Sequence, residues 1–132
     1  MRSRSGEYRR HQRKRIREGS RLPYAESAGI DPGKLKRYAL DPDAEPGKAQ
    51  GFATQLGIRL EDWDHLRDQI LERLPRAEAV LADISNPSRT GFTVRVPVNG
   101  LNGESRVVIT CWWVDAAHQP WLSTLWVTGE RP

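Results

Sequence analysis

The sequence predicts an α+β domain in which N-terminal helices are followed by an antiparallel meander of three or four strands, with the helices on one face of the sheet. Two observations support this prediction. Apolar residues recur with the helical period of 3.6 up to residue 74, and with the period of two that is typical of strands from residue 92 onwards. With 132 residues and 37% apolar content, the chain has room for one domain and one modest core.

A short first helix is predicted to begin after Asp31. The side chain of Asp31 can cap the helix, and Pro32 suits its first position because the N–H there has no partner within the helix. Ile30 and Leu35 stand where two apolar residues can pack across the cap. The helix should end before Asp41, because Asp41 precedes a proline and such residues disfavour the helical conformation.

Residues 46–74 are predicted to form two amphipathic helices joined at a glycine, and the rest of the chain is organised around them. The apolar stripe of the first helix consists of Ala49, Phe52, Ala53 and Leu56. Gly57 can adopt the left-handed conformation that ends this helix, and Ile58 can then fold back onto its apolar face. The stripe of the second helix consists of Trp63, Leu66, Ile70 and Leu74, and Pro75 ends it.

Four later segments have the pattern of strands. Residues 77–85 form the first, although the same residues could also prolong the preceding helix. Residues 91–98, 105–114 and 121–128 form the other three, and the turn NGLNG separates the second from the third. In the second strand the alternation places four apolar residues on one face, namely Phe92, Val94, Val96 and Val98, and Arg95 on the other.

The sheet face that the helices leave open is the candidate binding surface. We interpret the alternation as placing on it a set of cationic, hydroxyl and indole side chains: Arg95, Thr110, Trp112, Thr124 and Trp126. A guanidinium binds phosphate, hydroxyls orient phosphate or ribose oxygens, and indoles stack on unpaired bases, so the set suits single-stranded RNA. The same residue types also serve in cross-strand packing, and a shift of one residue in register would turn them into the core.

Residues 1–20 are predicted to be a disordered basic tail, and residues 21–132 a single domain. Residues 1–18 contain eight Lys or Arg and two Glu, a net charge of +6, so the remainder of a chain with a net charge of +4 carries −2. The tail has too few apolar residues to offset the entropy of ordering it. Its candidate RNA-binding residues are Arg9, Arg10, Arg13, Lys14 and Arg15. The alternative is a linker left from a larger polypeptide.

Other kinds of site find little support in the sequence. Cys111 is the single cysteine, which excludes an internal disulfide and a multi-cysteine metal site. The three histidines, His11, His65 and His118, lack zinc-ligand spacing, so we expect no metal and no cofactor. No long apolar run is present, so we expect no membrane span, no signal peptide and a cytoplasmic location.

Lys48 occupies an unusual position for a cation. It falls in the first turn of a predicted helix, where the helix dipole is positive, so an anion bound there would compensate both charges. The alternative is a surface lysine that points away from the helix end.

Two groups of residues together carry a family resemblance. The first consists of Gly47, Lys48, Ala49, Phe52, Leu56, Gly57 and Trp63. The second consists of Pro97, Val98, Gly100, Asn102 and Gly103 of a hairpin, followed by Thr124, Leu125, Trp126 and Val127. With these residues, the chain resembles over about residues 22–128 a domain of unknown function found at the C-termini of filamentous-haemagglutinin-like and contact-dependent-inhibition polymorphic toxins.

The resemblance implies the helices-then-sheet fold of the barnase, EndoU, colicin and RelE-like ribonucleases. It further implies a metal-independent endoribonuclease toxin that a small acidic antitoxin or immunity protein neutralises. In such a reaction the ribose 2′-hydroxyl attacks the adjacent phosphate, and cations stabilise the charge that develops. Lys48 and Arg95 would be these cations, and Thr110 and Thr124 would orient phosphate or sugar, while no residue stands out as the base.

Two departures from the family pattern support an alternative. Relatives carry basic residues where this chain has Ile109 and Thr128, so positive charge is lost from the implied site. The alternative is a non-enzymatic interaction or nucleic-acid-binding module that uses the basic tail.

Overall fold

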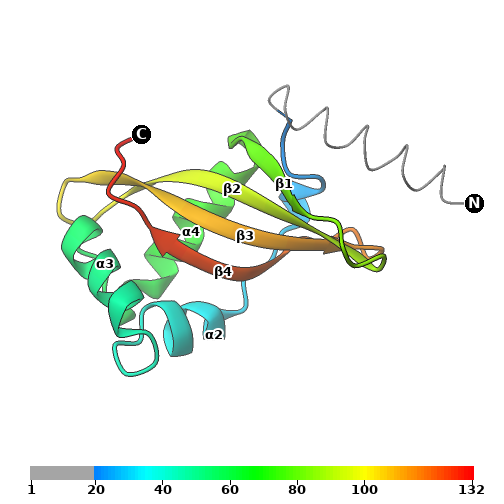
Figure 1. The fold of residues 1–132 in the computed structure, drawn as a ribbon. Coiled ribbons are helices and arrows are strands. Elements are labelled where there is room, and N and C mark those ends of the chain that lie inside the picture. The colour runs from blue at the N-terminus through cyan, green and yellow to red at the C-terminus, as the bar shows by residue number, and fades with distance from the viewer. Residues whose placement is uncertain (1–19) are drawn as a thin grey trace, which may run out of the picture.

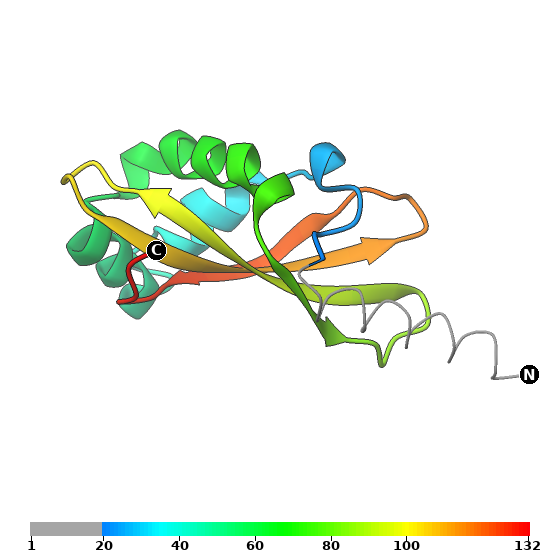
Figure 2. The ribbon, with the colours of Figure 1, turned by 90° about the horizontal axis from the view of Figure 1, so that it is seen from above.

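The computed structural model describes residues 20–132, and residues 1–19, which hold nearly all of the predicted basic tail, lie outside the described residues. The described chain forms an antiparallel sheet in the order β1-β2-β3-β4. Its strands are β1 (Ala79–Asp83), β2 (Arg89–Asn99), β3 (Ser105–Asp115) and β4 (Trp121–Val127). The helices pack against this sheet, with α4 across one side of it (Figures 1 and 2). The predicted fold class is therefore confirmed, and the first strand segment is a strand rather than a helical extension.

The first helical region follows the predicted cap. A short turn, η1 (Ala25–Ser27), precedes α2 (Pro32–Lys34), which continues into a π-helical turn, η2 (Leu35–Ala39). The side chain of Asp31 accepts a hydrogen bond of 3.0 Å from the N–H of Gly33, as a capping residue does. Ile30 and Leu35 are both buried, which agrees with the predicted apolar contact across the cap.

The central helix pair also begins and ends as predicted. α3 (Pro46–Leu56) stops at Gly57, whose φ of 64° is the left-handed conformation. The N–H of Ile58 donates to the carbonyl of Phe52 at 3.1 Å, and the Ile58 side chain is fully buried. A turn, η3 (Leu60–Asp62), then leads into α4 (Trp63–Arg73) and η4 (Leu74–Arg76), where Pro75 ends the helix.

The register of the sheet decides which side chains enter the core. β2 pairs with β3 so that Phe92 lies opposite Trp112, and Val94 opposite Thr110. Phe92 and Val94 are buried on the helix-facing side, and Trp112 and Thr110 are buried with them, at 1% and 0% exposure. The prediction that placed Thr110 and Trp112 on the open face is therefore wrong.

The physical reason is that the polar atoms of these two side chains have hydrogen-bond partners inside the core. The indole Nε1 of Trp112 donates to Thr110 Oγ1 at 2.7 Å, and Thr110 Oγ1 donates to the carbonyl of Val94 at 2.9 Å. A hydroxyl and an indole N–H that both have partners can be buried at little cost. The polar atoms that suggested exposure thus form a short hydrogen-bonded chain inside the core.

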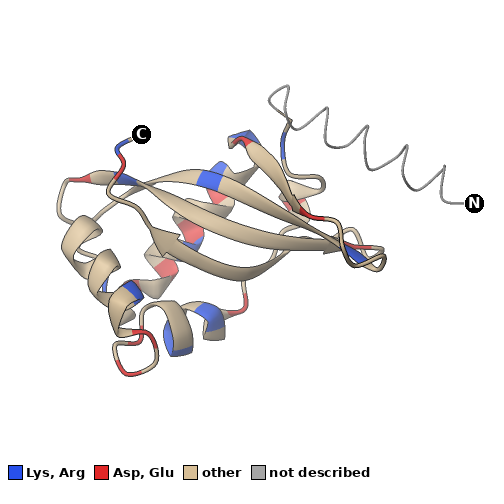
Figure 3. Ribbon diagram, in the orientation of Figure 1, with Lys and Arg blue, Asp and Glu red and all other residues tan. Residues whose placement is uncertain are grey.

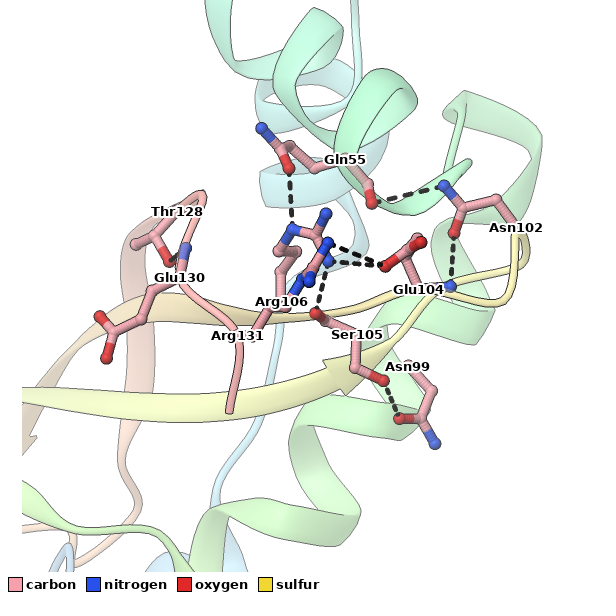
Figure 4. Close-up of polar contacts among 9 residues, drawn as sticks. All are labelled: Gln55, Asn99, Asn102, Glu104, Ser105, Arg106, Thr128, Glu130 and Arg131. Atoms are coloured by element: carbon pink, nitrogen blue, oxygen red, sulfur yellow. Dashed lines mark hydrogen bonds and ion pairs between the residues drawn. The ribbon is translucent and has the colours of Figure 1, made fainter.

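The tip of the β2–β3 hairpin docks on the C-terminal end of α3. The N–H of Leu101 donates to the carbonyl of Leu56 at 2.8 Å, which pairs a carbonyl that the helix end leaves without a helical partner. Asn102 Nδ2 lies 3.4 Å from the carbonyl of Gln55 (Figure 4). A Cβ on Gly100 would lie 2.3 Å from the Leu56 oxygen, so only glycine permits this approach. These hairpin residues of the second motif therefore have a role in packing.

A largely covered arginine, Arg106, strengthens the same junction. Arg106 is nearly covered, and its guanidinium donates to Gln55 Oε1 at 2.9 Å and to Glu104 at 3.0 Å (Figure 4). The hydrogen bond and charge of Arg106, with a further contribution from Arg131, hold the pKa of Glu104 below its usual range. The contact ties α3 to β3 and thereby fixes the helix beside the sheet.

None of the helices within residues 20–132 is long and apolar enough to cross a lipid bilayer.

The hairpin dock predicts that Gly100→Ala destabilises the fold. The added methyl group must push the hairpin away from Leu56, which typically costs about 1–3 kcal/mol. Gly47→Ala is the matched control, because a Cβ at Gly47 would meet nothing within 4 Å and alanine is the better helix former. Urea denaturation should show a lower midpoint for Gly100→Ala alone. Equal midpoints for the two variants would contradict the dock.

Candidate functional site

The open face of the sheet is the side opposite Val94, Thr110 and the helices. Here the register aligns residues of β2, β3 and β4 in two successive rows, about 6.6 Å apart along the strands. One row consists of Thr93, Cys111 and Thr124, and the next of Arg95, Ile109 and Trp126. In Figure 3, β4 carries no charged residue, while basic residues lie on β2 and on the helices beside β4.

Lys48 stands at the β4 end of the first row. Its Nζ donates to Thr124 Oγ1 at 2.8 Å and lies 4.7 Å from the centre of the Tyr38 ring. α3 brings the lysine to this edge because the helix packs beside β4, where a Cβ on Gly51 would touch Val127. The structure therefore brings together two of the predicted site residues, and the lysine does not point away into solvent.

Burial raises the pKa of the Cys111 thiol in the same row, while a hydrogen bond with Thr93 and the charge of Lys48 each lower it. The positive charge of Lys48 therefore lowers the pKa of Cys111, which lies on β3 at the centre of the open face. The cation acts on the face as well as on its hydrogen-bond partner.

Arg95 and Trp126 lie on the open face as predicted. Trp126 is 41% exposed, a large fraction for an indole. The guanidinium of Arg95 forms an ion pair with the carboxylate of Glu130, a residue that the sequence reasoning did not single out. β3 separates Arg95 from Trp126, so their strands are two inter-strand spacings, roughly 10 Å, apart.

The open face carries a third group of side chains, which was not predicted from the sequence. The Arg89 guanidinium stacks 3.8 Å from the Trp113 ring centre, and Trp121 tilts against Trp113 at 6.3 Å. Trp113 and Trp121 are opposite each other in the β3–β4 register. Gly91 leaves room for the stack, since a Cβ there would lie 3.1 Å from the Trp113 ring. The alternation could have indicated Trp113 had the buried Trp112–Thr110 pair been recognised, because adjacent residues face opposite ways.

The open face therefore combines three indoles with three cations. The indoles are Trp113, Trp121 and Trp126, and the cations are Lys48, Arg89 and Arg95. Lys48 and Arg95 belong to different rows and lie on opposite sides of β3. Thr110 and Trp112 are in the core and cannot touch a ligand on this face. The predicted tail residues Arg9, Arg10, Arg13, Lys14 and Arg15 lie outside the described residues.

A pocket of about 540 Å³ lies between residues 23–24, the β1–β2 loop and the β3–β4 loop, and Arg89 is among the residues that line it. Tyr24 and His118, at its rim, both have a left-handed backbone, and their rings stack at 4.3 Å. Of the side chains predicted for the site, none that the structure describes lines this pocket. The stack joins the start of the described chain to the β3–β4 loop.

One comparison with known proteins gives a match. The model of a family described as a domain of unknown function (DUF6883) matches residues 21–129. No curated protein and no solved structure matches the chain.

The row of Lys48 and Cys111 predicts the reactivity of the thiol. The raised pKa means that alkylation by iodoacetamide should be slow at neutral pH and should accelerate only in alkaline solution, because the thiolate is the nucleophile. Lys48→Met removes a cation that lowers the pKa, so its rate profile should move to still higher pH. Lys34→Met, on α2, is the control, since Lys34 has no part in the Cys111 shift. An unchanged profile for Lys48→Met would show that the lysine does not act on this face.

Proposed function

Because the chain belongs to the family described as a domain of unknown function (DUF6883), membership assigns no activity, and we propose from its own residues that the domain binds single-stranded RNA on the open sheet face. The observation that carries the proposal is the alignment of exposed indoles and cations on the sheet face that no helix of residues 20–132 covers. Indoles stack on unpaired bases of any sequence, and cations follow the phosphates.

The indoles supply the part of the binding that salt does not screen. Trp126 and Trp121 both expose more than a third of their surface, so a base can stack on either without unfolding any element. Each base stacked on an aromatic side chain contributes about 1–3 kcal/mol. A duplex cannot offer its bases in this way, and the proposal therefore selects single strands.

The cations supply the salt-dependent part. Lys48, Arg89 and Arg95 can each neutralise a phosphate, and the basic tail at residues 1–18 can add to this attraction. The remainder of the chain has a net charge of −2, so the open face has to concentrate its cations locally to attract RNA.

Trp126→Ala is predicted to weaken RNA binding by at least about fivefold at every salt concentration, because one stacking contact is lost. Lys48→Ala should instead reduce the slope of log affinity against log salt by about 0.7. Fluorescence anisotropy with a labelled single-stranded RNA and with the matching duplex measures both effects. Arg67→Ala is the control, because Arg67 stacks on Trp63 of α4, on the covered side of the sheet.

The contribution of the tail can be separated in the same assay. Replacement of Arg9, Arg10, Arg13, Lys14 and Arg15 by Gln should lower the salt slope and leave the loss caused by Trp126→Ala unchanged. If the tail variant abolishes binding while Trp126→Ala has no effect in the unmodified chain, the open face is not the RNA-binding surface.

RNA cleavage is a second candidate function, which the hydrogen bond between Lys48 and Thr124 favours. It joins a cation and a hydroxyl, the two groups that can orient a phosphate for attack by a ribose 2′-hydroxyl. If the domain cleaves RNA, it is a metal-independent toxin that acts on cytoplasmic RNA. The cations of the open face would then attract a small acidic antitoxin or immunity protein.

Expression of the chain without a partner is predicted to arrest growth and fragment RNA if the second candidate is right. Lys48→Ala should then restore growth, because the cation that stabilises the reacting phosphate is gone. Gel analysis of total RNA, with Arg67→Ala as the active control, checks this outcome. If RNA stays intact in cells that express the chain, and purified protein binds RNA without cutting it, the domain is a binding module and not a ribonuclease.

A further inference from the structure

The segment 128–131 crosses the open face beside Arg95. It continues from β4 along β3, where the N–H of Thr128 donates to the carbonyl of Val107 at 3.0 Å, and the N–H of Val107 donates to the carbonyl of Glu130 at 2.8 Å. The N–H of Glu130 donates in turn to Thr128 Oγ1 at 3.0 Å. In Figure 1 this segment passes in front of β3. The backbone therefore holds Glu130 in place independently of its carboxylate.

The carboxylate of Glu130 is directed at Arg95 and away from two other nearby arginines, Arg106 and Arg131. Arg106 and Arg131 both pair with Glu104, and Figure 4 shows the Glu130 carboxylate pointing away from these two arginines. Glu130 forms its ion pair with Arg95 across β3. A cation on the proposed RNA-binding face is thus already paired with an anion of the same chain.

The ion pair is exposed enough for another anion to replace the Glu130 carboxylate beside Arg95. The side chains of Arg95 and Glu130 are 43% and 55% exposed, and water and salt weaken an ion pair between two such exposed groups. A phosphate offers a guanidinium several acceptor oxygens and a two-point hydrogen bond. Only the Glu130 side chain has to move to admit a phosphate, because the backbone of the segment can stay paired with Val107.

We infer that Arg95 is an anion subsite whose resting occupant is the carboxylate of Glu130, and that a phosphate of single-stranded RNA displaces this carboxylate on binding. The inference rests on the proposed function for the identity of the ligand. Glu130 then acts as a built-in competitor, which lowers the affinity of the open face for weakly bound anions and yields to a polymer that also stacks on Trp126.

Glu130→Gln is predicted to tighten binding of single-stranded RNA by about two- to fivefold, because the competing charge is removed while the shape is kept. Glu72→Gln is the matched control, since Glu72 is an exposed carboxylate on α4, on the covered side of the sheet. The gain should disappear in the double variant Glu130→Gln/Arg95→Gln. Thermal unfolding of all variants confirms that they are folded.

A second readout separates this inference from the proposed function. The Nε–H NMR signal of Arg95, identified by its loss in Arg95→Gln, should shift with inorganic pyrophosphate at a lower concentration in Glu130→Gln than in the unmodified chain. If RNA binds to no variant but pyrophosphate moves the signal in this way, the RNA function fails and the anion subsite holds. If RNA binds equally well to the unmodified chain and to Glu130→Gln, the competition by Glu130 is refuted.

Discussion

The hydrogen-bonded chain from Trp112 through Thr110 to the carbonyl of Val94 is the constraint on which the rest of the structure depends. It places two polar side chains in the core at no cost in unpaired groups, and it fixes the face of every other residue in β3. A shift of one residue in the register of β3 would bury Cys111 and Trp113. It would also break the hydrogen bond from the Thr110 hydroxyl to the carbonyl of Val94. The composition of the open face follows from this buried pair.

The second constraint is the contact between the β2–β3 hairpin and the end of α3. Leu101 pairs with the Leu56 carbonyl, and Gly100 allows the approach. Because the helix is held at its C-terminal end, its first turn comes to rest beside β4, where Lys48 reaches Thr124. A contact made at one end of α3 therefore determines the position of a cation at the other end.

The helices, their caps and the order of the strands were predictable because each depends on local signals. Asp31, Gly57 and Pro75 mark helix ends by their own conformational preferences, whatever lies around them. The positions of Arg95, Thr124 and Trp126 were also predictable, because Leu125 and the valines of β2 are clear apolar neighbours. Thr110 and Trp112 were not, because β3 is apolar on both faces and an alternation of apolar residues could not choose between them. The ion pair of Arg95 with Glu130 joins residues 35 positions apart, which no local pattern reveals.

The residues that carry the resemblance described in the sequence analysis and the residues that could bind a ligand are largely different sets. Gly57, Gly100 and Asn102 have their backbone or side chain at the junction of α3 with the hairpin, where a larger residue would not fit or would lose a contact. Trp113, Trp121 and Arg89, by contrast, form the stack at one end of the open face and are not among the residues that carry the resemblance. Those residues of the resemblance that lie at this junction therefore belong to the scaffold, while the chemistry depends on what the scaffold exposes. Lys48 and Trp126 belong to both sets. Since neither is needed to fill the core, the open face is where the physical argument for function is strongest.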